Sequence, residues 1–227
     1  MSHHGIPDFV RNFDSLMLFA AAAFLGALVA KRMVGGTIAG HLCLQIGRCG
    51  WGHVVLLSLI PMVAGGAILA AIAGGEPAPM KPLASPLLKG VVRAPIMEEL
   101  LYRGLLVGVT AAVLNWQGRR FWCNAFAAAA LFASTHVDWT RTGVANGWPT
   151  LLVTGIGGLW YTWLLSRWRS LWVPMILHAG MNLGWLLAGA TGGAGGGGLT
   201  INLLRAATIA IATWMTAHRT REARHAI

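Results

Sequence analysis

Long apolar runs alternate with short polar or Gly/Pro-rich segments along the whole chain. A helix needs roughly 20 apolar residues to cross the ~30 Å hydrocarbon core of a bilayer. Seven runs approach or reach that length, and we expect each to form a membrane-spanning helix: residues 15–30, 54–74, 95–114, 121–137, 149–165, 171–190 and 199–217. The pattern therefore predicts an all-α fold, a polytopic transmembrane helical bundle of about seven spans.

Composition supports a membrane location. Hydrophobic residues make up 56% of the 227 residues and charged residues only 11%, and the mean hydropathy is +0.63. These values lie far outside the usual range of soluble domains. We expect one integral membrane domain over residues 1–227, in a multi-pass protein of a bacterial inner membrane. The segments GEPAPMKPLASP (75–86) and TGGAGGGG (191–198) are expected to be non-helical connectors.

The distribution of basic residues predicts an orientation. The formal net charge is +10, but the Lys and Arg residues punctuate the apolar spans rather than forming one basic patch, which argues against a nucleic-acid partner. With the N-terminus outside, ten Lys/Arg fall on the cytoplasmic side and five outside, while Arg103 and Arg205 fall within spans. The positive-inside rule therefore predicts an external N-terminus and a cytoplasmic C-terminus.

Three ionisable residues interrupt the start of the third span. The stretch APIMEELLYRGLLVGV (94–109) contains Glu98, Glu99 and Arg103. A charge near the bilayer centre costs about 3 kcal/mol or more, so such residues usually face the bundle interior and serve function. Glu99 and Arg103 are spaced i, i+4 and can form a purely structural salt bridge. That pairing leaves Glu98 without a partner on its own helix, as a candidate general base or acid.

Two other spans carry polar residues spaced one helical turn apart. Phe132 and His136 end the fourth span, and His178 and Asn182 lie in the sixth. Because successive spans run in opposite directions, the predicted topology places both clusters and the glutamates in the outer half of the bilayer. We therefore expect the three clusters to converge.

These three clusters also carry a family resemblance. EELLYR (98–103) is similar to an E-E-x-x-x-R motif, FASTH (132–136) to F-x-x-x-H and HAGMN (178–182) to H-x-x-x-N. In this order, on separate spans, they resemble the CPBP, or ABI, family of glutamic intramembrane proteases, which includes prenyl-CAAX proteases and bacteriocin-processing enzymes. The resemblance covers about residues 85–190, which we expect to form the catalytic core.

The resemblance implies a role for each motif residue. Glu98 and His136 match the pair that activates a water for attack on the scissile carbonyl. His178 and Asn182 match the pair that stabilises the oxyanion, and Glu99 and Arg103 match the residues that orient the site. Preorganised donors of this kind are what a tetrahedral intermediate requires.

No cofactor is expected. The resemblance implies a metal-independent mechanism, and the chain lacks an H-E-x-x-H helix, although Glu98 with His136 and His178 would be chemically competent zinc ligands. A second candidate metal set lies in HLCLQIGRCGWGH. Its spacing matches no common zinc pattern, so we interpret its four members as ordinary loop residues: His41, Cys43, Cys49 and His53.

The expected partners are the lipid bilayer and a polypeptide substrate with a membrane-embedded or membrane-proximal cleavage site. Prenyl-CAAX proteases act on the cytosolic side, whereas the predicted topology turns this site outward and favours an exported protein. A prenyl-CAAX-type protease, a non-catalytic membrane scaffold and a proton-coupled transporter remain alternatives. The transporter would be expected to show repeated halves, and the sequence has none.

The topology gives a direct prediction. A compartment-specific reporter inserted beside Arg119 and Arg120 should be active only on the cytoplasmic side, because these arginines lie between the third and fourth spans. A reporter that is active outside the cell at this loop would show that the predicted orientation of the site is reversed.

Overall fold

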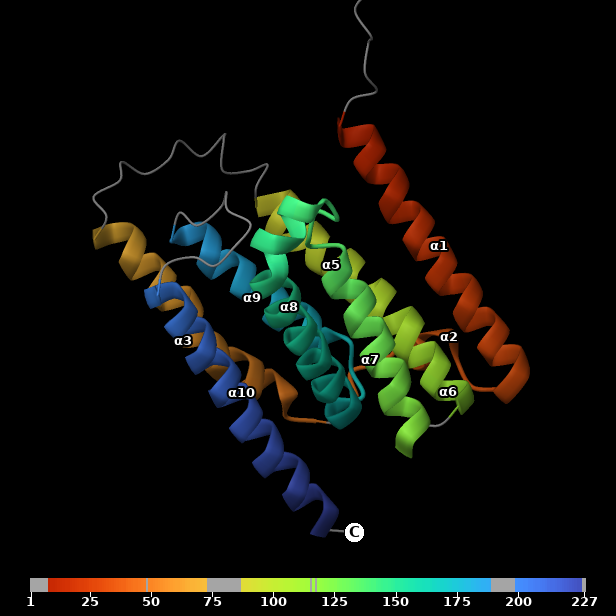
Figure 1. Ribbon diagram of the computed structural model, residues 1–227. Helices are drawn as coiled ribbons and strands as arrows, with labels where there is room; N and C mark the ends of the chain where they lie inside the picture. Colours follow the sequence, from red (N-terminus) through yellow and green to blue (C-terminus); the bar gives the residue numbers. More distant parts are fainter. Residues whose placement is uncertain are drawn as a thin grey trace, which may run out of the picture.

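The computed structural model is helical throughout, and it describes residues 8–47, 49–72, 87–114, 116, 118–188 and 199–225. Each predicted span corresponds to a helical segment (Figure 1): α1 (Asp8–Val34), α3 (Trp51–Ile72), the run from η1 to α6, α7 (Gly118–Ser134), α8 (Arg141–Trp168), α9 (Trp172–Leu187) and α10 (Leu199–His225). A short helix, α2 (Ile38–His41), follows α1. Within the described residues there is no strand, which confirms the all-helical class. Both expected connectors, 75–86 and 191–198, lie outside these residues.

The third segment is one continuous helical run with changing hydrogen-bond pattern. It consists of η1 (Leu87–Arg93), α5 (Ala94–Glu98), η2 (Glu99–Val109) and α6 (Thr110–Leu114), where η denotes π-type bonding. Wide π-type turns inside helices are frequent at functional sites. Here the change from α5 to η2 falls between the two adjacent glutamates.

Helix α7 ends earlier than the hydrophobic run predicted. The hydroxyl groups of Ser134 and Thr135 donate to the carbonyl oxygens of Leu131 and Phe132, at 2.7 and 2.8 Å. Because these side chains compete for backbone acceptors at the helix end, the helix stops at Ser134. His136 therefore lies in the turn after α7 rather than on the helix itself.

Helix α8 begins earlier than predicted. The Thr140 hydroxyl accepts a hydrogen bond from the Gly143 backbone N–H at 3.0 Å, which caps the helix N-terminus. Pro149, the expected first residue, lies inside the helix instead. The cap thus adds two turns of helix before the apolar run.

The helices pack as two groups around the middle of the bundle. Helix α3 packs against α9 and α10 on one side, while α7 packs against α8, and α1 lies against η2 at the opposite edge (Figure 1). Glycines allow the closest approach between α3 and α9. A Cβ atom added at Gly66 would lie 2.5 Å from the carbonyl oxygen of Gly184.

The outer surface of the bundle is strongly apolar. Large hydrophobic side chains that are about half exposed or more occur on five of the long helices, among them Leu56, Ile60, Phe126, Leu152 and Leu203. A soluble monomer rarely exposes so much apolar surface. By length and hydropathy one described helix, Trp51–Leu69, clearly qualifies as a membrane span, with a mean hydropathy of 2.0. The seven-span topology and the positions of the termini remain predictions.

We predict that Gly66→Ala destabilises the bundle, because the new methyl group must push the α3 and α9 backbones apart. Overpacking of this kind costs typically ~1–3 kcal/mol, so the purified protein should unfold several degrees lower in detergent. Gly52→Ala in the same helix is the matched control, since no atom lies within 4 Å of a Cβ at that position. Equal melting temperatures for the two variants would contradict the observed packing.

Candidate active site

A buried ion pair lies at the centre of the bundle. The Arg103 guanidinium donates from Nη1 to Glu99 Oε1 at 3.1 Å, and the two side chains are 2% and 0% exposed. Both residues belong to η2, one turn apart. This confirms the salt bridge expected from the i, i+4 spacing.

His178 on α9 joins this pair to the second glutamate. Its Nδ1 lies 3.0 Å from Glu99 Oε1, and its Nε2 lies 3.7 Å from Glu98 Oε2. Because an ionised carboxylate only accepts hydrogen bonds, Nδ1 carries the proton in the shorter contact. The imidazole therefore lies between the two carboxylates, with its orientation set by Glu99.

The two glutamates have different surroundings although they are adjacent in sequence. Glu98, the last residue of α5, has a side chain that is 29% exposed, whereas Glu99 is fully buried. No ion pair joins Glu98 to any described residue of its own helical run. Glu99 is held by Arg103 and His178, so Glu98 is the carboxylate that remains accessible for chemistry.

Aromatic rings enclose the charged groups. The Arg103 guanidinium carbon lies 4.4 Å from the centre of the Phe132 ring and 5.3 Å from that of Tyr161. Tyr161 also stacks on His178, with ring centres 5.5 Å apart and an interplanar angle of 24°. Cation–π contacts of this kind are strengthened when water is excluded. Helices α7 and α8 thereby fix both Arg103 and His178.

His136 reaches the site from the turn after α7. Its Nδ1 lies 2.9 Å from the Phe132 carbonyl oxygen, and its ring packs edge-on against Phe132 with centres 4.7 Å apart. Because the carbonyl is an acceptor, Nδ1 donates, and Nε2 keeps a free lone pair. His136 interacts electrostatically with Glu98. No hydrogen bond joins these two side chains within the described structure.

Asn182 lies one turn beyond His178 on α9. Its Nδ2 donates to the carbonyl oxygen of Gly90 on η1 at 2.8 Å. An amide group has two N–H donors, so one remains for another acceptor. His178 and Asn182 thus present neighbouring polar groups from one helix face.

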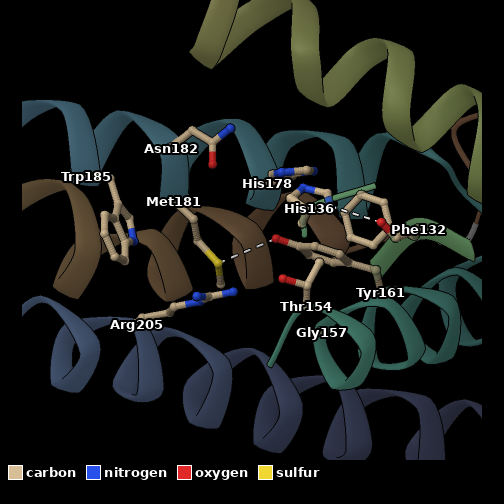
Figure 2. A pocket seen from close by; sticks show the side chains of 10 residues that line it. All are labelled: Phe132, His136, Thr154, Gly157, Tyr161, His178, Met181, Asn182, Trp185 and Arg205. Atoms are coloured by element: carbon tan, nitrogen blue, oxygen red, sulfur yellow. Dashed lines mark hydrogen bonds between the residues drawn. The ribbon is translucent and has the colours of Figure 1, made fainter. Parts of the chain in front are cut away.

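These side chains border a cavity of about 200 Å³, seen in Figure 2. Its lining comes from the end of α7 and from α8, α9 and α10: Phe132, His136, Thr154, Gly157, Tyr161, His178, Met181, Asn182, Trp185 and Arg205. Glu98 approaches His178 from the α5 side, while Glu99 and Arg103 lie behind the lining. Four of the seven motif residues line this cavity: Phe132, His136, His178 and Asn182. Glu98 and Glu99 are connected to it through their contacts with His178.

Two charged or polar features of this site lie outside the sequence motifs. Tyr161 stacks on His178 and donates from its hydroxyl to the Met181 sulfur at 3.4 Å. Arg205 on α10 lines the cavity. The position of Arg205 within a predicted span was a signal for functional importance, whereas nothing in the sequence around Tyr161 distinguishes it from a packing residue.

The second candidate metal set is spread over α2, which ends at His41, the loop with Cys43 and Cys49, and α3, which contains His53. His41 Nε2 lies 2.7 Å from the Gly35 carbonyl oxygen and donates a hydrogen bond to it, so this ring nitrogen has no lone pair for a metal. Burial raises the pKa of the Cys43 thiol to about 12, so this side chain stays protonated and is a poor metal ligand. Cys49 and His53 are exposed. No group of three or more potential ligands occurs among the described residues.

The chain is similar to a known protein family. Residues 81–184 match the family described as type II CAAX prenyl endopeptidase Rce1-like. This confirms the resemblance drawn from the three motifs, which all lie within the matched residues, and similarity to this family supports a membrane-bound protease. No curated protein and no solved structure matched the chain significantly.

We predict that Glu99→Ala strongly destabilises the protein, because it leaves Arg103 buried without a carboxylate. Removing one partner of a buried ion pair costs about 3–5 kcal/mol. The double variant Glu99→Gln, Arg103→Met should be more stable than Glu99→Ala, because no uncompensated charge remains. Thermal unfolding in detergent measures both, with the exposed Arg141→Met as the control. A double variant no more stable than Glu99→Ala would contradict a role for the ion pair in neutralising Arg103.

Proposed function

We propose that the protein is an intramembrane endopeptidase in which Glu98 activates a water molecule to hydrolyse a peptide bond. The observation that carries this proposal is that the two glutamates differ in their burial and in their ion-pair contacts. Glu99 accepts hydrogen bonds from both Arg103 and His178. Glu98 is partly exposed and lies 3.7 Å from His178 Nε2. A general base must be accessible, and the partial exposure of Glu98 beside His178 supports it in this role.

In the proposed mechanism Glu98 and His136 hold the water between them. Glu98 takes a proton from the water as the oxygen attacks the scissile carbonyl carbon. The same proton then passes to the departing amine as the C–N bond breaks, so the base returns to its starting form. The free Nε2 of His136 supports this arrangement, because it leaves a second acceptor for the hydrogens of the water.

His178 and Asn182 are proposed to stabilise the negative oxygen of the tetrahedral intermediate. His178 would do so through a second proton on Nε2, because its Nδ1 proton is donated to Glu99. The support is their adjacency on one face of α9 and the unused N–H of the Asn182 amide. Removing one preorganised donor from such a site typically costs ~10²–10³ in kcat. Glu99 and Arg103 act indirectly in this scheme, since they hold the His178 ring in place.

The proposed substrate is a membrane-anchored polypeptide cut within or beside the bilayer. The matched family is named for CAAX prenyl endopeptidases, which supports a chain anchored by an apolar group close to the cleaved bond. The predicted outward orientation of the site favours exported proteins. The small size of the cavity supports an extended segment of chain rather than a folded one.

The decisive variant is Glu98→Gln, which preserves shape but removes the base. Processing of a membrane-anchored substrate should fall by roughly 10²-fold or more. The melting temperature should change little, because the contact of Glu98 with His178 is long, at 3.7 Å, and Glu98 is partly exposed. Asp138→Asn is the matched control, since this exposed carboxylate follows α7 and binds Thr140 instead of the site. The readout is the mass of exported membrane proteins at equal enzyme abundance. Processing that persists in the Glu98→Gln variant would contradict the proposed role of Glu98 and favour the scaffold and transporter alternatives.

A further inference from the structure

Tyr161 on α8 is a buried residue of the cavity that belongs to none of the three motifs. Its side chain is 6% exposed. The ring stacks on His178, with ring centres 5.5 Å apart, and packs against Trp160 with ring centres 5.0 Å apart. The Arg103 guanidinium carbon lies 5.3 Å from the ring centre. The phenol is therefore held on several sides before any ligand enters the cavity.

The hydroxyl group of Tyr161 points into the cavity. Figure 2 shows the phenol beside α9, with the hydroxyl directed toward Met181. It donates to the Met181 sulfur at 3.4 Å, and this is its one hydrogen bond in the described part of the chain. A thioether sulfur is a weak acceptor. An anionic oxygen in the cavity would therefore replace Met181 as the acceptor at little cost, because hydrogen bonds to charged groups are stronger.

This hydroxyl lies among the groups already assigned to the oxyanion. Its acceptor Met181 comes three residues after His178 and one before Asn182, which is about 4.5 Å and about 1.5 Å along the axis of α9. His178, Asn182 and Tyr161 line the same cavity. Arg205 is among its described lining residues, and no Asp or Glu is. The charge on the cavity wall therefore favours negative charge in this space.

We propose that the Tyr161 hydroxyl is a third donor to the negative oxygen of the tetrahedral intermediate, an inference that rests on the proposed peptidase function. The hydroxyl leaves the Met181 sulfur and donates to the oxygen as negative charge develops there. No proton is transferred, so Tyr161 is unchanged at the end of the cycle. His178 needs a second proton before its Nε2 can donate, whereas a tyrosine carries its hydroxyl proton at neutral pH. Tyr161 thus supplies a donor that does not depend on the protonation of His178.

A packing role for Tyr161 would need only its ring. Tyr161→Phe keeps the ring against His178 and beside Arg103 and removes only the oxygen atom. The Met181 sulfur then loses one weak hydrogen bond, and no charged group is left without a partner. Tyr161→Leu removes both the hydroxyl and the ring. Comparing the two variants therefore separates a donor from a packing residue.

The experiment measures cleavage by the full chain in phosphatidylcholine vesicles. The substrate is a synthetic peptide that spans the bond whose processing in cells requires Glu98, as read from the mass of the cleaved protein. Tyr161→Phe should lower kcat by roughly 10²-fold, the usual loss for one donor of this kind, with KM nearly unchanged. The reason is that a hydrogen bond formed only in the transition state affects kcat and not the binding of the substrate.

Thr213→Val is the matched control, because it also removes one hydroxyl that contacts α8. Thr213 accepts a hydrogen bond from the Trp160 indole at 2.8 Å and does not line the cavity. This variant should keep the native kcat even if its melting temperature is lower. It therefore shows what the loss of a hydroxyl does to the protein when the oxyanion is not involved.

A second measurement needs no turnover. In a phosphinic analogue of the same peptide, a phosphinate and a methylene group replace the scissile carbonyl and N–H, so the analogue carries a negative oxygen and is not cut. Tyr161→Phe should bind this analogue roughly 10- to 100-fold more weakly than the native protein does, the usual contribution of a charged hydrogen bond. The uncut peptide should bind Glu98→Gln equally well with and without Tyr161→Phe.

The outcomes separate this inference from the proposed function. Native kcat and native affinity for the analogue in Tyr161→Phe would overturn the role of the hydroxyl and leave the peptidase intact, and a loss confined to Tyr161→Leu would assign Tyr161 to packing. A raised KM at unchanged kcat would place the hydroxyl on the bound substrate and contradict the proposal as well. If no protein is processed in a Glu98-dependent way, the peptidase function itself is wrong, and this role is wrong with it.

Discussion

The buried contact between Glu99 and Arg103 is the interaction on which the rest of the site depends. Two full charges have been removed from water, and each is tolerable only because the other is present. Neither is satisfied by its own helix alone. Arg103 lies between the rings of Phe132 and Tyr161, and Glu99 accepts from His178. The two members of the ion pair therefore connect the third helical segment to α7, α8 and α9. These contacts hold the helices together around the proposed site.

The same interaction explains why the two adjacent glutamates differ in orientation and in exposure. Consecutive helical residues point about 100° apart, so only Glu99 can face Arg103 and the bundle centre. Glu98 points elsewhere and keeps partial exposure. His178 is shared by both carboxylates, but its short contact is to Glu99. Glu99 thus orients the histidine that lies beside Glu98.

Features set by local sequence could be predicted, and features set by packing could not. Hydropathy located the helices, and i, i+4 spacing identified the Glu99–Arg103 pair. Hydropathy did not reveal that Ser134 and Thr135 end α7 through hydroxyl contacts, which moves His136 into a turn. The stacking of Tyr161 on His178 depends on how α8 lies against α9. No pattern within either helix encodes that distance.

Arg205 shows a second limit of motif reasoning. The residues proposed to hydrolyse the bond all lie within 81–184, whereas α10 contributes a cavity wall from beyond that range. Helix α10 packs mainly on α3 (Figure 1). A change at Arg205 therefore alters a wall of this cavity from a helix that contributes none of the motif residues.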